Sequence, residues 1–489
     1  MKGHAKLQLF DNNGKLIQET EKDNMITNAL NYVIPAMIAS NQTPNTGLLP
    51  LAYNALGGLM MFDGELEEDP DNIHYPNKNV HLVGYGGRYT DSSNIQRGSF
   101  NSSESGETDT GYVMVWDFNT SQANGTIRSI ALTHRLTGTD PFYLYTRDLQ
   151  VASLRTSDGT KNCLVRDAKN QLLYYIDRAL DNTSSGFAVK SAYVPLNLFK
   201  VSDGAVGAKK YSGVIKRLAY YGIKHAYQYN TGTTSKPNWE TRYLNITTGV
   251  YYKDGYDGYA YVAWTPGNSS GDGFFYLKRM KISDFSFEEE DQIRIDCPNC
   301  QLRGPNSNNT TGNSTGESGY GCVSNGYAYF MAWARHKVYR INLSNPVDIM
   351  EISIGDQFTI YDNGDRLVPM KTGGIRLMCN EAKGDGYNHY RLCFISEDGA
   401  YNIDQIDQGN DGYNFRYDQR STTDDLLSLS HYYDGANAEV RIEGGYLGTI
   451  CNLSTPVVKT AAASLKVIYT LTDYVEPDEP KEAEDSTGE

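Results

Sequence analysis

Long apolar runs and clusters of basic residues are both missing from this sequence of 489 residues. No stretch reaches the roughly 18 apolar residues that a membrane-spanning helix needs, so we expect no membrane insertion. The N-terminus lacks the apolar core of a secretory signal, and we therefore expect none. The formal net charge of −15 argues against a protein that coats nucleic acid, because neutralising phosphates takes clustered Lys and Arg.

The familiar catalytic signatures are absent as well. We find no phosphate-binding or dinucleotide-binding glycine pattern, no serine-hydrolase elbow and no zinc-protease motif, and the eight His residues are scattered. Two acidic runs, Glu65–Asp71 and Glu288–Asp291, contain carboxylates of the kind that glycosidases use in pairs. Contiguous carboxylates point apart or lie in solvated loops, so we interpret both runs as surface charge. The sequence predicts no catalytic residue and no enzyme.

The seven cysteines are widely spaced and odd in number, which does not indicate a disulfide framework. We expect most of them to be buried thiols. Cys297 and Cys300 have CxxC spacing, but no second CxxC or HxxxH follows, which favours free thiols or a local disulfide over zinc or redox chemistry. Asp407–Asp418 resembles a calcium loop but has Gly409 at its third position, so we interpret it as a polar loop. We predict no metal and no cofactor.

Tyrosine and glycine are abundant, with 38 Tyr and 47 Gly, and many Asn-Gly and Asp-Gly pairs favour an all-β chain with tight turns. Residues 4–20 predict a hairpin. After it, Asn24 is expected to cap a helix whose apolar stripe runs from Met25 to Ile38 at helical spacing. Pro35 lies inside this stripe and predicts a kink or break near residues 33–34.

The terminal segments resemble a known family. They read MKGHAKLQLFD, GGLMMFDGELEEDPDNI, GYVMVWDF, ANGTIRSIALTH and, near the end, NLSTPVVKTAAASLKVIYTLT. These segments resemble structural proteins encoded among the tail genes of tailed bacteriophages and prophages of Firmicutes. The resemblance implies a tail fibre, baseplate or receptor-binding protein in the virion, assembled in the bacterial cytoplasm. It also implies two kinds of partner: other tail proteins, and further copies of the chain in a homotrimer or ring.

The middle of the chain does not share this resemblance, and its strands repeat one pattern. In each repeat, an apolar strand with alternating Tyr is followed by a tight turn and then by a strand with Arg or Lys. The repeat is clearest in the Tyr-containing segments Asp257–Tyr261 and Asn325–Tyr329. Such repeats predict a β-propeller, with a sandwich or barrel as the alternative. The span 140–445 is long enough for about six or seven blades of about 40 to 50 residues.

The sequence therefore predicts a mainly β protein in four parts. Residues 1–139 form a β-sandwich-like virion-attachment domain with one helix, and 140–445 form the propeller-like domain. Residues 446–475 contain an alternating strand that we expect to return to the N-terminal domain. Residues 476–489 are acidic and rich in Pro, which predicts a disordered tail.

Aromatic side chains are the candidate ligand-binding residues of the propeller. Sugars stack on Tyr or Trp rings while Asn, Asp and Gln bind their hydroxyl groups. The candidates are Tyr259, Tyr261, Trp264, Tyr327, Tyr329 and Trp333. The alternative is that these rings pack between blades. We predict that the propeller recognises a host cell-surface glycan, with a purely architectural tail protein and a tail-mounted depolymerase as alternatives.

Overall fold

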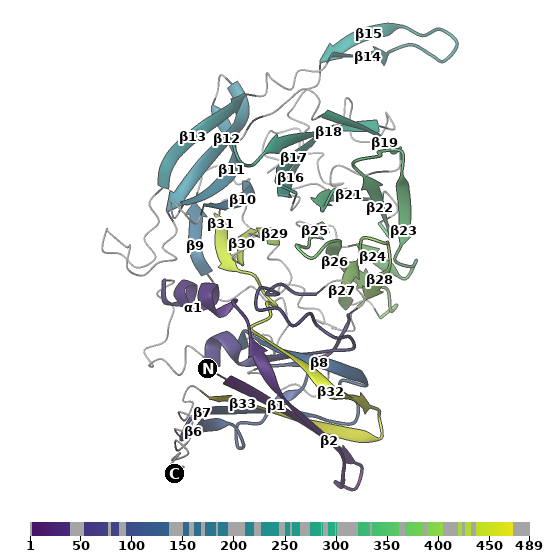
Figure 1. Cartoon of the computed structure of the whole chain (residues 1–489). Helices are drawn as coiled ribbons and strands as arrows, with labels where there is room; N and C mark the ends of the chain where they lie inside the picture. The colour runs from purple at the N-terminus through teal and green to yellow at the C-terminus, as the bar shows by residue number, and fades with distance from the viewer. Residues whose placement is uncertain are drawn as a thin grey trace, which may run out of the picture.

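The computed structural model describes residues 2–472 with gaps, the longest of which are 40–52, 136–149, 194–210, 301–320 and 404–418. For the strands between residues 150 and 254 the backbone alone is described, except at 231–239. The predicted acidic tail at 476–489 and the run Asp407–Asp418 lie outside the described residues. Two bodies make up the rest, a sheet built from both ends of the chain and a ring of smaller sheets (Figure 1).

Ten strands form one network, here called the terminal sheet, in the order β4-β3-β8-β32-β2-β1-β33-β7-β5, with β6 paired to β7. The strands are β1 (Lys2–Asp11), β2 (Leu16–Ile26), β3 (Gly58–Phe62), β4 (Leu82–Gly86), β5 (Ser99–Phe100), β6 (Gly106–Thr108), β7 (Gly111–Phe118), β8 (Gly125–Thr133), β32 (Thr449–Lys459) and β33 (Ala463–Thr472). Only two residue pairs join β2 to β32, so the network divides into two halves. Leu7 from one half and Leu59 from the other belong to one buried cluster, which gives the predicted sandwich-like domain.

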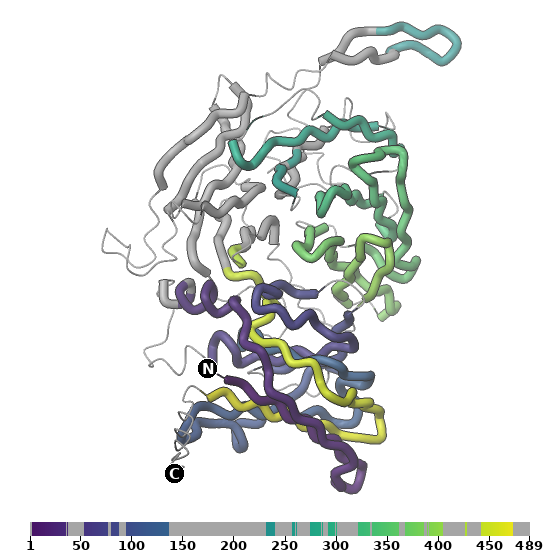
Figure 2. Tube along the Cα trace, in the orientation of Figure 1, coloured from purple at the N-terminus to yellow at the C-terminus, as the bar shows by residue number. Residues whose placement is uncertain are grey.

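The last strand of the chain lies between two N-terminal strands. Antiparallel pairing places Val467 of β33 opposite Leu7 of β1 and opposite Trp116 of β7. Every second residue of β33 faces the core: the buried ones are Ala463, Leu465, Val467, Tyr469 and Leu471. The first and last described residues meet in this sheet, because Lys2 is paired with Thr472 (Figure 2). The prediction that the C-terminal strand returns to the N-terminal domain is confirmed.

The helix begins later than predicted. Asn24 does not cap it, because β2 continues to Ile26 and the Asn24 amide donates to the hydroxyl of Tyr469. Helix α1 (Leu30–Ala39) follows a turn in which the Thr27 hydroxyl accepts a hydrogen bond from the backbone amide of Ala29. Pro35 lies inside α1, so of the predicted kink or break the break does not occur. No helix among the described residues is long and apolar enough to cross a bilayer.

Five small sheets form the propeller, and a further hairpin projects from it (Figure 1). The sheets are β10 (Lys161–Asp167), β11 (Leu172–Asp181), β12 (Ser184–Tyr193), β13 (Tyr211–Ala219); β16 (Val250–Asp254), β17 (Tyr259–Trp264), β18 (Phe274–Lys281), β19 (Gln292–Asp296); β20 (Gly321–Ser324), β21 (Tyr327–Met331), β22 (Lys337–Asn342), β23 (Ile349–Ser353); β24 (Phe358–Ile360), β25 (Leu367–Pro369), β26 (Ile375–Glu381), β27 (His389–Ile395), β28 (Tyr401–Ile403); and β29 (Gln419–Thr422), β30 (Leu427–His431), β31 (Asn437–Ile442), β9 (Gln150–Arg155). The hairpin is β14 (Ala226–Asn230) and β15 (Trp239–Tyr243).

The ring of blades is closed. Its innermost strands touch in sequence, β10 with β16, β16 with β20, β20 with β25, β25 with β29, and β29 with β10. The first propeller strand, β9, completes the last blade by pairing with β31. The predicted propeller is confirmed. The described residues form five blades, whereas the length of the segment allowed six or seven. The hairpin β14–β15 takes up part of the remaining length.

The propeller packs against the terminal sheet through buried side chains. One apolar cluster contains Met60 of β3 together with Phe394 of β27. His74 Nδ1 lies 2.7 Å from the Glu443 carboxylate, and this buried pair joins a loop of the terminal sheet to the segment that follows β31. Apolar packing and a buried hydrogen bond both resist rotation between two bodies, so the propeller has a fixed orientation on the sheet.

A buried histidine at the exit from β8 should make stability depend on pH. Burial, with the adjacent charge of Arg135, lowers the pKa of His134 to about 3. Below about pH 6.5 the unfolded chain binds a proton at this residue, whereas the native chain does not until about pH 3, so acid favours unfolding. Between pH 7 and pH 4 we expect this residue to lower the free energy of unfolding by at most about 3 kcal/mol.

The variant His134→Gln lacks this titration. Urea unfolding of both proteins between pH 7 and pH 4 measures the difference. The free energy of unfolding should fall less steeply with acid in the variant than in the wild type, whatever the offset between them at pH 7. Parallel curves would contradict the assignment of a neutral buried His134.

Candidate functional site

The two echoing segments are equivalent strands of consecutive blades. Residues 257–261 lead into β17, and residues 325–329 lead into β21. Both β17 and β21 are the second strand of their sheet. The register also matches, because Tyr261 lies opposite Arg279 and Tyr329 lies opposite Arg340. The repeated sequence pattern therefore encodes one structural unit of the propeller, used twice.

The inner Tyr of each unit is buried. Tyr261 is 2% exposed and Tyr329 is 0% exposed. The hydroxyl of Tyr261 donates to the Asp257 carboxylate, and burial is the main cause that raises the pKa of both phenols. A buried ring presents no face to a sugar, so these two residues act in the core of the blades.

The outer Tyr of each unit is half-buried beneath a guanidinium group. The Arg279 guanidinium carbon lies 4.6 Å from the centre of the Tyr259 ring, and that of Arg340 lies 4.8 Å from the Tyr327 ring. Cation–π contact covers one face of each ring. The side chain of Trp264 and all of Trp333 lie outside the described residues. A ligand-binding role for this set of aromatics stays a prediction.

Arg340 also joins two blades. Its Nη1 donates to the backbone carbonyl of Glu397, in the turn between β27 and β28 of the next blade. The Glu397 carboxylate accepts a hydrogen bond from the Asn325 amide at 3.1 Å, next to the tight turn that starts β21. Asn325 and Gly326 both have positive φ there, as the Asn-Gly pair predicts. The unit around Tyr327 therefore stabilises the contact between blades.

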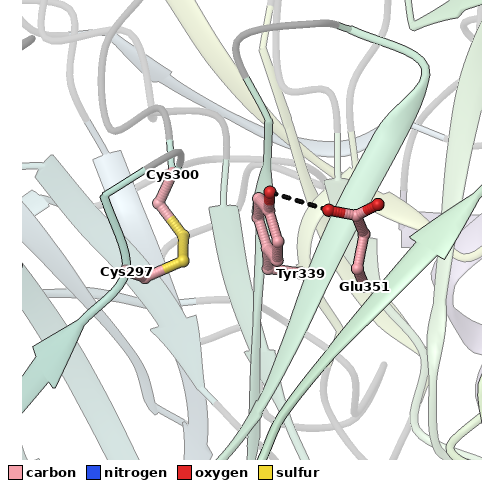
Figure 3. Close-up of a disulfide and its surroundings, with 4 residues drawn as sticks. All are labelled: Cys297, Cys300, Tyr339 and Glu351. Carbon is pink, nitrogen blue, oxygen red and sulfur yellow. Dashed lines mark hydrogen bonds between the residues drawn. A yellow bond between two sulfur atoms is a disulfide. The ribbon is translucent and has the colours of Figure 1, made fainter. Parts of the chain in front are cut away.

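The CxxC pair forms a local disulfide between Cys297 and Cys300, beside the blade that carries Tyr339 and Glu351 (Figure 3). The Tyr339 hydroxyl donates to the Glu351 carboxylate at 3.0 Å, and a hydrogen bond from Lys337 lowers the pKa of Glu351. The free cysteines Cys322, Cys379, Cys393 and Cys451 are buried thiols, as predicted. Within the described part of the chain, no three His, Cys, Asp or Glu side chains form a metal-binding group.

The described acidic run carries ordinary surface charge. Within residues 65–71, Glu68 accepts a hydrogen bond from Lys22 at 3.0 Å and another from the Asn452 amide, while the other carboxylates of the run are exposed. The second run, residues 288–291, lies outside the described residues. No opposed pair of carboxylates is formed by the first run.

The sequence analysis missed an exposed Trp at the base of a projecting loop. Trp239 begins β15 opposite Asn230 and is 62% exposed. The loop between the strands is ordered by local hydrogen bonds, including Asn238 Nδ2 to the Thr231 hydroxyl at 3.0 Å. Residues 231–239 are all exposed, so this ring supports no core. The Pro237-Asn238 turn signal before an aromatic was the available clue.

No protein-family model matches the chain, and no curated protein matches it. Among solved structures it is similar to an exo-β-1,3-galactanase from Clostridium thermocellum, at 10% identity, TM-score 0.30, and 60% and 61% coverage of the two chains. A family GH43 β-1,3-galactosidase matches at 10% identity, TM-score 0.30, and 60% and 58% coverage. The match thus spans about three fifths of each of these proteins.

These matches contradict the prediction that the chain is not an enzyme, because the proteins found are glycoside hydrolases. That prediction is corrected. At a TM-score of 0.30 the likeness assigns no substrate, reaction or catalytic residue to this chain.

A comparison of two arginines tests the structural role of the Tyr327 unit. Arg340 and Arg294 both lie over an aromatic ring, but only the buried Arg340 bonds to a carbonyl of the next blade, whereas Arg294 pairs with Asp296 in solvent. We expect Arg340→Met to lower the free energy of unfolding by about 2 kcal/mol, because a part-buried carbonyl loses a charged donor. Arg294→Met should cost less than about 1 kcal/mol. Equal losses in urea unfolding would contradict the interblade role of Arg340.

Proposed function

We propose that this chain is a structural protein of a bacteriophage tail, which attaches to the virion through the terminal sheet and presents its propeller to a host cell-surface glycan. The observation that carries the proposal is the joining of both chain ends in one sheet, with the propeller inserted between β8 and β32. The resemblance of the terminal segments to tail proteins supports the assignment of this sheet to attachment. Other tail proteins and further copies of the chain, in a trimer or ring, are its proposed partners in a virion assembled in the bacterial cytoplasm.

A receptor-binding protein has to hold its binding surface outward against mechanical load. Two covalent connections and a buried junction hold the propeller more firmly than a single linker would. The hairpin β14–β15 projects from the propeller on the side away from the terminal sheet (Figure 1). Trp239 is exposed there, and a Trp ring with a free face is suited to stacking on a sugar.

Binding of the purified protein to cell walls tests the proposal. Labelled full-length protein is incubated with walls from a panel of Firmicutes, either untreated or oxidised with periodate, which cleaves sugar diols. We expect sedimentation with untreated walls and a loss of at least tenfold after oxidation. Trp239→Ala should weaken binding several-fold, since a stacked aromatic is removed from the contact.

The matched control is Val347→Ala, which truncates an 87% exposed residue between β22 and β23, away from the hairpin. This variant should bind walls like the wild type. Equal binding before and after oxidation, or no binding to any wall, would contradict glycan recognition and favour a purely architectural tail protein. Released reducing ends are measured in the same supernatants, which distinguishes a depolymerase from a protein that only binds.

A further inference from the structure

A concave groove lies where the propeller meets the terminal sheet. One wall comes from residues 75–76 and 80–82 of the sheet domain and the other from residues 394–402 at the β27–β28 turn, so the groove is made by segments far apart in sequence. Junctions between packed bodies are common places for small-molecule sites. Neither wall belongs to the aromatic set predicted from the sequence.

Three aromatic rings line this junction groove. Tyr75 and Phe394 stack across the junction, with ring centres 5.4 Å apart and planes inclined by 18°. Tyr75 also meets Phe62 edge-on, and its carbonyl accepts a hydrogen bond from the Thr372 hydroxyl at 3.1 Å, so this wall is rigid. Tyr401 lies at the open side and is 47% exposed.

Polar side chains complete the lining. The His81 imidazole and the Asn402 amide lie on the groove and have no side-chain hydrogen bond to any described residue. The Ser396 hydroxyl is already used, because it donates within its own turn to Asp398 and Ala400. None of the described lining residues is Asp, Glu, Lys or Arg.

We propose that the junction groove binds one neutral sugar ring of a glycan. An exposed aromatic face takes the apolar C–H face of a pyranose, and amide and imidazole groups both donate to and accept from its hydroxyl groups. Arg and Lys are the usual partners of a phosphate or carboxylate ligand, and the described lining contains neither. The choice of a sugar as ligand rests on the proposed function. The site itself is separate, because the groove does not include Trp239.

Saturation-transfer NMR on the full-length protein tests the groove. The probes are the methyl glycosides of glucose, galactose and N-acetylglucosamine, with glucose 6-phosphate and glucuronate as charged comparisons. We expect transfer to the ring protons of at least one neutral glycoside and weaker transfer to the charged sugars. Tyr401→Ala and Asn402→Ala should each weaken binding about tenfold, while Tyr401→Phe should retain most of it.

Val347→Ala is the matched control, because it truncates an exposed apolar residue outside the groove and should leave this binding unchanged. Thermal unfolding curves identify any variant that fails to fold, and the conservative Tyr401→Phe protein then decides the result. The absence of transfer to every neutral glycoside, preference for a charged sugar, or wild-type binding by both alanine variants would overturn the proposal. Wall binding that survives these groove variants and is lost in Trp239→Ala would leave the proposed function intact.

Discussion

The structure depends on two antiparallel pairings that bring the ends of the inserted propeller together. β8, from which the chain leaves the terminal sheet, pairs with β32, by which it returns. β9, the first propeller strand, pairs with β31, the last. The chain therefore leaves and re-enters at one place, and an insertion of this length costs little more loop entropy than a short one once the propeller has closed on itself. Formation of either pairing brings together the strands of the other, which lowers the entropy cost of the second pairing.

This arrangement relates the fold to the proposed role. The terminal sheet is complete only when residues from both ends are present, because β33 fills the position between β1 and β7. The propeller is held by apolar packing and by the pair His74–Glu443 at the same junction. A protein built in this way transmits force from its propeller to the terminal sheet through packed side chains as well as through the chain.

Periodicity predicted what local sequence determines, and it missed what tertiary contacts determine. The alternation along β33 predicted its return, because a strand with one apolar face must cover another. Asn is a residue type that often caps helices, but pairing with β1 keeps Asn24 in a strand. Alternating Tyr residues predicted strands of a propeller, whereas which Tyr faces the core depends on the neighbouring blade. The junction groove joins residues 75–76 and 80–82 to residues 394–402, and no sequence spacing could have indicated it.

Hydrogen exchange of the native full-length protein tests the central claim, that both chain ends form one cooperative sheet. The account predicts that amides of β1 and β33 exchange with the same protection, because β33 is paired on both edges and cannot leave without opening the core. The free energies of opening derived for the two strands should agree within about 1 kcal/mol. Exchange of β33 a hundredfold or more faster than that of β1 would show that the C-terminal strand detaches alone, and would contradict the account.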